Sequence, residues 1–166
     1  MEIIDITQDI IVKTSGATMN TIQQIAQWFL SKESMTHKKL QKLCYYAQAW
    51  HLALHGGELF EERFEAWVHG PVSPVLYSIY SDYGWEKIPL EKSHPVFNED
   101  AEGILQAVWN TYGPFDGDQL EALTHSEAPW LNARGNLRPC DTCTHEIKHL
   151  DMKEYYLKKF KDSQNE

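Results

Sequence analysis

The sequence has little of what several classes of protein require. Its three cysteines are an odd number and do not make a disulfide framework. No run approaches the roughly 18 apolar residues of a membrane span, and no leader peptide is recognisable at the start. Basic residues are also few, because 15 Lys and Arg stand against 24 Asp and Glu, a formal net charge of −9. We therefore expect a cytoplasmic protein that binds no membrane.

The same charge balance bears on the choice of partner. A non-specific grip on nucleic acid depends on clustered Lys and Arg, so we expect no direct binding of nucleic acid. A basic protein would instead be attracted by the acidic surface.

What is present indicates a folded helical domain. The 166 residues are 42% apolar and include six tryptophans, enough for one domain with its own core. In residues 36–54, apolar residues recur at the three-and-four spacing of an α-helix. This stripe contains Leu40, Leu43, Cys44, Ala47, Trp50, His51 and Leu54. Tyr45, Ala49 and Leu52 fall on the opposite face, so we expect a helix buried nearly all round, capped by Thr36 and ended by Gly56.

Weaker patterns organise the rest of the chain. We expect residues 1–18 to be an N-terminal arm or linker and residues 19–162 to be the domain. Capping signals at Asn20, Ser73, Asn98 and Asp116 predict further helices over residues 20–30, 74–83, 98–112 and 116–125. A short helical segment is expected at residues 129–134 and a last helix at residues 151–160. Alternation in residues 58–69 predicts a strand of a hairpin beginning near Leu59, whereas residues 70–74 and 85–97 are predicted to be irregular. The predicted fold class is therefore mainly α: a single compact helical domain around a central buried helix, with a minor β-hairpin.

One cluster offers the ligand types of a zinc site. Cys140, Cys143, His145 and His149 supply two thiols and two imidazoles. Only one residue separates Cys143 from His145, whereas finger-type sites place about a dozen between the pairs. We interpret the segment as a polar loop and expect neither metal nor cofactor.

Motifs of common enzymes are missing. The sequence has no Gly-x-Ser-x-Gly elbow, no phosphate-binding glycine loop and no HExxH. Cys44 and His51 fall on the core face of the central helix, where a thiol acts as a small hydrophobe and an imidazole is a hydrogen-bonded boundary residue. We expect no enzyme; the alternative is a small enzyme that uses His69 or His125.

Three lysines gather in the first turns of the same helix. Lys38, Lys39 and Lys42 stand where the helix dipole disfavours cations. Either they are exposed to solvent, or they form a basic patch that faces an acidic neighbour.

Residues 67–77 are the strongest candidate for a binding surface. A glycine and two prolines restrict the backbone between the predicted strand and helix, so little entropy is lost on binding. The flanking aromatic residues are of types enriched in interface hot spots. The candidate partner-binding residues are Trp67, His69, Gly70, Pro71, Val72, Pro74 and Tyr77. Alternatively, the segment is only a firm connection between strand and helix.

Residues 40–84 resemble the Panacea domain family, also called SocA-like antitoxins or phage-associated GepA-like proteins. The family pattern is KLQKLLYYAQGWYLAL, then Leu-Phe, then EAWxxGPVxPxxY. It is matched here by residues 39–54, 59–60 and 65–77, with Cys44 where Leu is common. A second family feature, Tyr-Gly and then Leu-Thr-His and Pro-Trp, is matched at residues 112–113, 123–125 and 129–130. The resemblance spans about residues 20–160, and the residues it assigns to a family-motif core are Leu43, Tyr45, Tyr46, Trp50, Thr124, His125, Pro129 and Trp130.

The resemblance implies an antitoxin-like role. Such a protein neutralises a co-encoded toxin by binding it directly, through occlusion of the toxin or its delivery to a protease. The implied partners are that toxin and, further, a protease or chaperone. Family members are often carried on prophages, so the alternative is a phage or prophage protein that interacts with the host.

Overall fold

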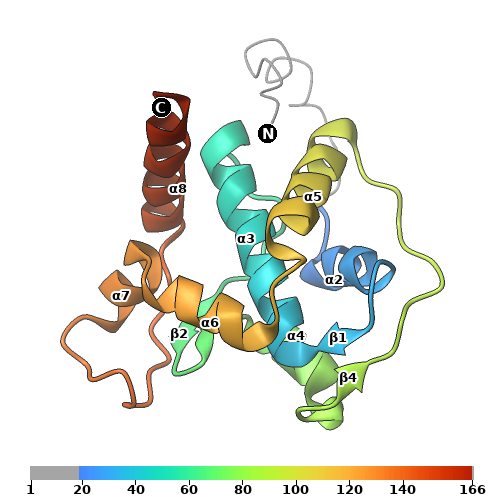
Figure 1. The fold of residues 1–166 in the computed structure, drawn as a ribbon, viewed down its shortest axis with the longest axis horizontal. Helices are drawn as coiled ribbons and strands as arrows, with labels where there is room; N and C mark the ends of the chain where they lie inside the picture. The colour runs from blue at the N-terminus through green and yellow to red at the C-terminus, as the bar shows by residue number, and fades with distance from the viewer. Residues whose placement is uncertain (1–18, 166) are drawn as a thin grey trace.

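Helix α3 (His37–His55) runs through the centre of the domain in the computed structural model, which describes residues 19–165 (Figure 1). It packs against α2 (Ile22–Leu30), α5 (Glu99–Tyr112), α6 (Gly117–His125) and α8 (His149–Gln164). Because neighbours surround it, even its polar residues Lys42 and Gln48 are buried. The prediction of a mainly α domain built around a buried central helix, with a minor hairpin, is confirmed. The expected arm at residues 1–18 lies outside the described residues.

The helix ends follow local side-chain chemistry. The Thr36 hydroxyl accepts from the backbone N–H of Lys39, and Gly56 ends α3 with a φ of 81°. The caps predicted at Ser73, Asn98 and Asp116 are confirmed. The cap predicted at Asn20 is wrong by one residue. Thr21 caps α2 instead, because its side chain and that of Gln24 form a reciprocal capping box.

The β-hairpin begins later than predicted. Strands β2 (Glu65–Trp67) and β3 (Gly70–Val72) pair antiparallel, so the prediction that residues 70–72 are irregular is wrong. A proline is tolerated in an edge strand because the hydrogen bond it cannot donate is not needed there. Residues 59–60 do not join the hairpin, because the Gln48 side chain of α3 bonds the N–H of Leu59 and the carbonyl of Phe60 instead.

A second strand pair was missed by the sequence patterns. Strands β1 (Met35–Thr36) and β4 (Lys87–Ile88) pair antiparallel, and β4 lies in the segment predicted to be a loop. The predicted helix over residues 74–83 is α4 (Pro74–Tyr80) followed by the 3-10 turn η1 (Ser81–Tyr83). Helix α7 is Ala128–Arg134, as expected. Helix α8 is longer than the predicted residues 151–160.

The buried face of α3 changes along its length. Trp50, His51 and Leu54 of the predicted stripe are only half-buried, whereas Tyr45 and Leu52 on the opposite side are buried. Helix α8 packs against α3 here, and the ring of Tyr156 approaches both Tyr45 at 6.2 Å and Trp50 at 5.4 Å. Cys44 is fully buried, as expected. No helix within residues 19–165 has the length and hydrophobicity needed to cross a membrane.

Candidate partner-binding site

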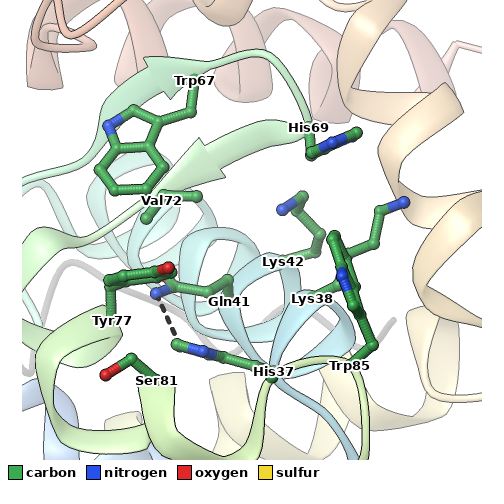
Figure 2. A pocket seen from close by; sticks show the side chains of 11 residues that line it. His37, Lys38, Gln41, Lys42, Trp67, His69, Val72, Tyr77, Ser81 and Trp85 are labelled. Carbon is green, nitrogen blue, oxygen red and sulfur yellow. Dashed lines mark hydrogen bonds between the residues drawn. The ribbon is translucent and has the colours of Figure 1, made fainter.

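A cavity of about 260 Å³ opens between the first turns of α3, the β2–β3 hairpin and the η1 region (Figure 2). Its wall consists of residues from these three elements and from α4. They are His37, Lys38, Gln41, Lys42, Trp67, His69, Val72, Tyr77, Ser81, Gly84 and Trp85. Trp67, His69, Val72 and Tyr77 come from the predicted partner-binding set, so the fold gathers these four around one hollow.

Aromatic rings form the apolar walls. The Tyr77 ring stacks on His37 with centroids 5.3 Å apart and meets Trp67 at 5.2 Å. Trp85 stands at the rim with 71% of its surface exposed, and its ring meets His69 edge-on. We define the cavity rim as His69, Tyr77 and Trp85, which are all exposed. Trp85 was not among the residues predicted from the sequence. The feature that could have revealed it is its position as a lone tryptophan directly after Gly84 in a polar loop.

Lysine side chains of α3 bring positive charge to this region. Lys42 is 1% exposed, and its Nζ donates to the carbonyl of Pro71 at 3.3 Å. Burial lowers the pKa of Lys42 to about 7, with Lys38 lowering it further and Glu121 opposing the change. Lys38 pairs with Asp118 at 2.7 Å and with Glu121 at 3.2 Å. The Lys39 Nζ pairs with Glu33 at 2.9 Å.

These contacts decide between the two interpretations of the lysines. Lys38 and Lys39 face acidic neighbours within the chain itself, and Lys39 and Lys42 are buried. A solvent-exposed turn is therefore the wrong interpretation. The local pattern could not show this, because the neighbours come from α6 and from the residues ahead of β1.

A polar network behind the cavity fixes the start of α4. The Gln41 side chain bonds both the N–H and the carbonyl of Ser73, at 2.9 and 3.1 Å. Its Nε2 also lies 3.1 Å from Nε2 of His37, the contact drawn in Figure 2. Burial lowers the pKa of His37 to about 4, so the imidazole is neutral at pH 7 and accepts from the amide.

The predicted partner-binding residues divide by exposure. Gly70, Pro71 and Val72 are buried and shape the loop, whereas Pro74 is exposed to solvent like the rim. Val72 is only 7% exposed. A partner can therefore touch the ends of the segment but little of its middle.

The two histidines of the enzyme alternative lie in different surroundings. His69 lines the cavity, and its Nδ1 lies 2.6 Å from the carboxylate of Glu121. His125 is half-buried, stacks on Trp130 with centroids 3.9 Å apart and does not line the cavity. Burial lowers the pKa of His125, and its Nε2 has no hydrogen-bond partner among the described residues. No sequence pattern predicted that Glu121 would contact this site.

The four residues with the ligand types of a zinc site, Cys140, Cys143, His145 and His149, make separate contacts. Cys140 is exposed and Cys143 is buried. His145 Nδ1 contacts the carbonyl of Ala133, and His149 Nδ1 contacts Glu58 at 3.0 Å. Within residues 19–165, no group of three or more His, Cys, Asp or Glu side chains is placed to hold a metal ion.

The family-motif residues lie mostly in the core. Leu43, Tyr45, Tyr46, Thr124, Pro129 and Trp130 are buried, and Trp50 and His125 are half-buried. The Trp130 indole N–H donates to the carbonyl of Trp67 at 2.8 Å. The motif thus ties α7 to the hairpin that carries the cavity.

Comparison with known proteins gives a family. The family model described as "Antitoxin SocA-like, Panacea domain" matches residues 40–131, more than half of the chain. Antitoxin SocA of Caulobacter vibrioides (strain NA1000 / CB15N) is 35% identical over 123 residues, which are 61% of this chain and 65% of that protein. The chain thus matches just under two thirds of that relative's length. No solved structure matches the chain. The match to the family model includes nearly all of the central helix motif, the hairpin and the Pro-Trp of α7, and the chain therefore belongs to the antitoxin SocA-like, Panacea domain family.

Proposed function

We propose that this protein is a non-enzymatic antitoxin that neutralises a co-encoded toxin by binding it at the cavity rim. The family membership supports a toxin partner in general. The observation that carries the choice of surface is the exposure of His69, Tyr77 and Trp85 around one cavity. Exposed aromatic side chains beside a hollow are typical anchors of protein interfaces.

The backbone behind the rim is held firmly. The Arg134 guanidinium donates to the carbonyl of Ala66 at 2.8 Å. The Gln41 side chain holds Ser73 through two hydrogen bonds. A surface already held in one conformation loses little entropy when a partner binds, which favours affinity.

Charge and cysteine state fit the same proposal. The net charge of −9 attracts a basic toxin and accelerates its encounter with the protein. All three cysteines are unpaired, as is usual for proteins of the reducing cytoplasm. The bound antitoxin occludes the toxin's active surface or hands the toxin to a protease. A phage or prophage protein that binds a host protein through the same rim is the competing proposal.

The test begins with the gene next to this one. We expect its product to be toxic alone and harmless when both are expressed together. Trp85→Ala should weaken binding by about 10- to 30-fold, the equivalent of roughly 1.4–2 kcal/mol, and should abolish protection. Its melting temperature should stay unchanged because the side chain is 71% exposed.

Leu150→Ala is the matched control, since Leu150 is a 62% exposed apolar residue that does not line the cavity. It should leave binding and protection intact. Wild-type affinity in both Trp85→Ala and Tyr77→Ala would show that the toxin binds elsewhere. A neighbouring product that is harmless alone would contradict the antitoxin proposal itself.

A further inference from the structure

The cavity contains the amine of a buried lysine that has no matching anion among the described residues. Lys42 lines the cavity, although only 1% of the residue is exposed, and within the described part of the chain its Nζ makes one hydrogen bond, to the Pro71 carbonyl. An ammonium group has three donors. Among residues 19–165, no carboxylate lies within 4.0 Å of its Nζ. The side chain is confined there, because its Cε packs against Gly70 so closely that a Cβ at Gly70 would lie 2.5 Å away.

The nearest carboxylate is already engaged. Glu121 of α6 attracts Lys42 electrostatically, but its Oε1 lies 2.6 Å from His69 Nδ1 and 3.2 Å from Lys38 Nζ. Of the other groups that face Lys42, Lys38 repels the cation, and the nearby imidazoles of His37 and His125 are kept from protonation by burial. An anion that entered the cavity would thus supply the charge that Lys42 lacks.

The other residues of the cavity wall indicate what kind of molecule would carry the negative charge. Trp67, Tyr77 and Trp85 present rings, and a flat ring packs well on aromatic faces. At about 260 Å³, the cavity is smaller than the roughly 300–1,000 Å³ of drug-sized sites, so it suits a ligand with one ring. We propose that this cavity binds a small organic carboxylate with a single flat apolar ring, whose carboxylate pairs with Lys42 and whose ring lies among the three aromatic side chains. This site goes beyond toxin binding and does not depend on it.

The site couples binding to protonation. Burial holds the pKa of Lys42 near 7, and a carboxylate beside the amine favours the charged form and raises that pKa. Binding at about pH 8 should therefore take up a proton, up to one for each ligand bound. It should also weaken as the pH rises above 7.

Calorimetric titration of the full chain with phenylacetate tests the proposal. The uncharged phenylacetamide is the matched control ligand, because it keeps the ring and loses the negative charge. We expect saturable binding of phenylacetate at least tenfold tighter than that of phenylacetamide. Titrations in two buffers of different ionisation enthalpy should show the proton uptake at about pH 8. Absence of saturable phenylacetate binding, or equal binding of the two ligands, would overturn the proposal.

Two variants locate the anion. Lys42→Met keeps a long unbranched side chain in the same space and should remove both the preference for phenylacetate and the proton uptake. Lys92→Met is the matched control on an exposed lysine outside the cavity, and it should change neither. A melting temperature of Lys42→Met at or above that of the wild type shows that folding is intact. Retained preference and proton uptake in this folded variant would contradict the assignment to Lys42.

An acidic side chain of a bound toxin is a second possible source of the carboxylate that pairs with Lys42. The free ligand is favoured here because Lys42 lies below the rim, in a space that holds a single ring. The toxin affinity of Lys42→Met, measured without any small molecule, distinguishes the two sources. Unchanged affinity is expected, and a loss of tenfold or more would assign the site to the toxin and overturn the free ligand. Because the wild type binds the toxin in either case, this outcome is independent of the antitoxin proposal.

Discussion

The hydroxyl of Tyr46 donates a hydrogen bond of 2.7 Å to the carboxylate of Glu127, a residue only 2% exposed. Burial raises the pKa of Tyr46 far above its usual range, so the hydroxyl keeps its proton and stays a donor. Tyr156 donates to the same oxygen at 2.9 Å, and Lys159 Nζ reaches the other at 3.3 Å. One buried carboxylate at the start of α7 thereby joins α3 and α8.

Removing one of these donors should destabilise the domain. We expect Tyr46→Phe to lower the free energy of unfolding by about 1.5–3 kcal/mol, the range for a hydrogen bond to a charged group. The ring stack on Tyr112 survives in this variant, so the change isolates the hydroxyl. Urea denaturation measures it. Tyr155→Phe is the control, because Tyr155 is half-buried and makes no hydrogen bond to this carboxylate; equal losses in both variants would contradict a special role for Glu127.

Gly70→Ala should perturb the hairpin and the cavity together. Gly70 has a φ of 103°, which disfavours any side chain, and a Cβ there would lie 2.5 Å from Cε of Lys42. We expect a loss of roughly 1–3 kcal/mol in the free energy of unfolding, the usual cost of such backbone strain. Thermal melts should show it. Gly57→Ala is the comparison, since nothing lies within 4 Å of its Cβ; a similar loss there would mean that neither the φ nor the contact at Gly70 matters.

The buried amine of Lys42 should make stability depend on pH. The folded pKa is about 7 and the unfolded value is about 10.4, so between these values the unfolded chain binds more protons. Stability therefore rises with pH in this window. We expect Lys42 to contribute a rise of roughly 2 kcal/mol between pH 7.5 and 9, from about 1.4 kcal/mol per pH unit.

Denaturation of Lys42→Met at several pH values isolates this contribution. The variant should be more stable than the wild type near pH 7, because a buried charge is replaced by an apolar chain, and its pH dependence should be flatter. Lys92→Met should follow the wild-type curve. Parallel curves for Lys42→Met and the wild type would show that the amine titrates normally.

A chain that begins at Met19 should fold. The capping box of Thr21 and Gln24 and the bridge between Asn20 and Phe60 lie within the retained residues. We expect the melting temperature to fall by no more than about a few degrees, because these contacts do not involve residues before Met19. An aggregated product or a melting temperature far below that of the full chain would show that those residues complete the core.

Elements that depend on neighbours along the chain could be predicted from local residue patterns. Thr36, Ser73, Asn98 and Asp116 cap helices because their side chains bond backbone N–H groups three residues ahead, which is a local event. The long stripe of α3 likewise predicted its burial. Alternation in residues 58–69 predicted one strand of the hairpin, and the local pattern of residues 129–134 predicted α7.

Features that join distant segments of the chain could be seen only in the folded structure. Strands β1 and β4 are two residues each and pair across about fifty residues, so no local period marks them. Gln48 takes residues 59–60 out of the hairpin through hydrogen bonds that a strand pattern cannot reveal. The burial of Lys42 and the engagement of Glu121 also arise only when α3, α6 and the hairpin meet. Burial and charge pairing depend on which surfaces meet in space, and for that reason the local pattern of lysines could not distinguish an exposed turn from a patch that faces acidic neighbours.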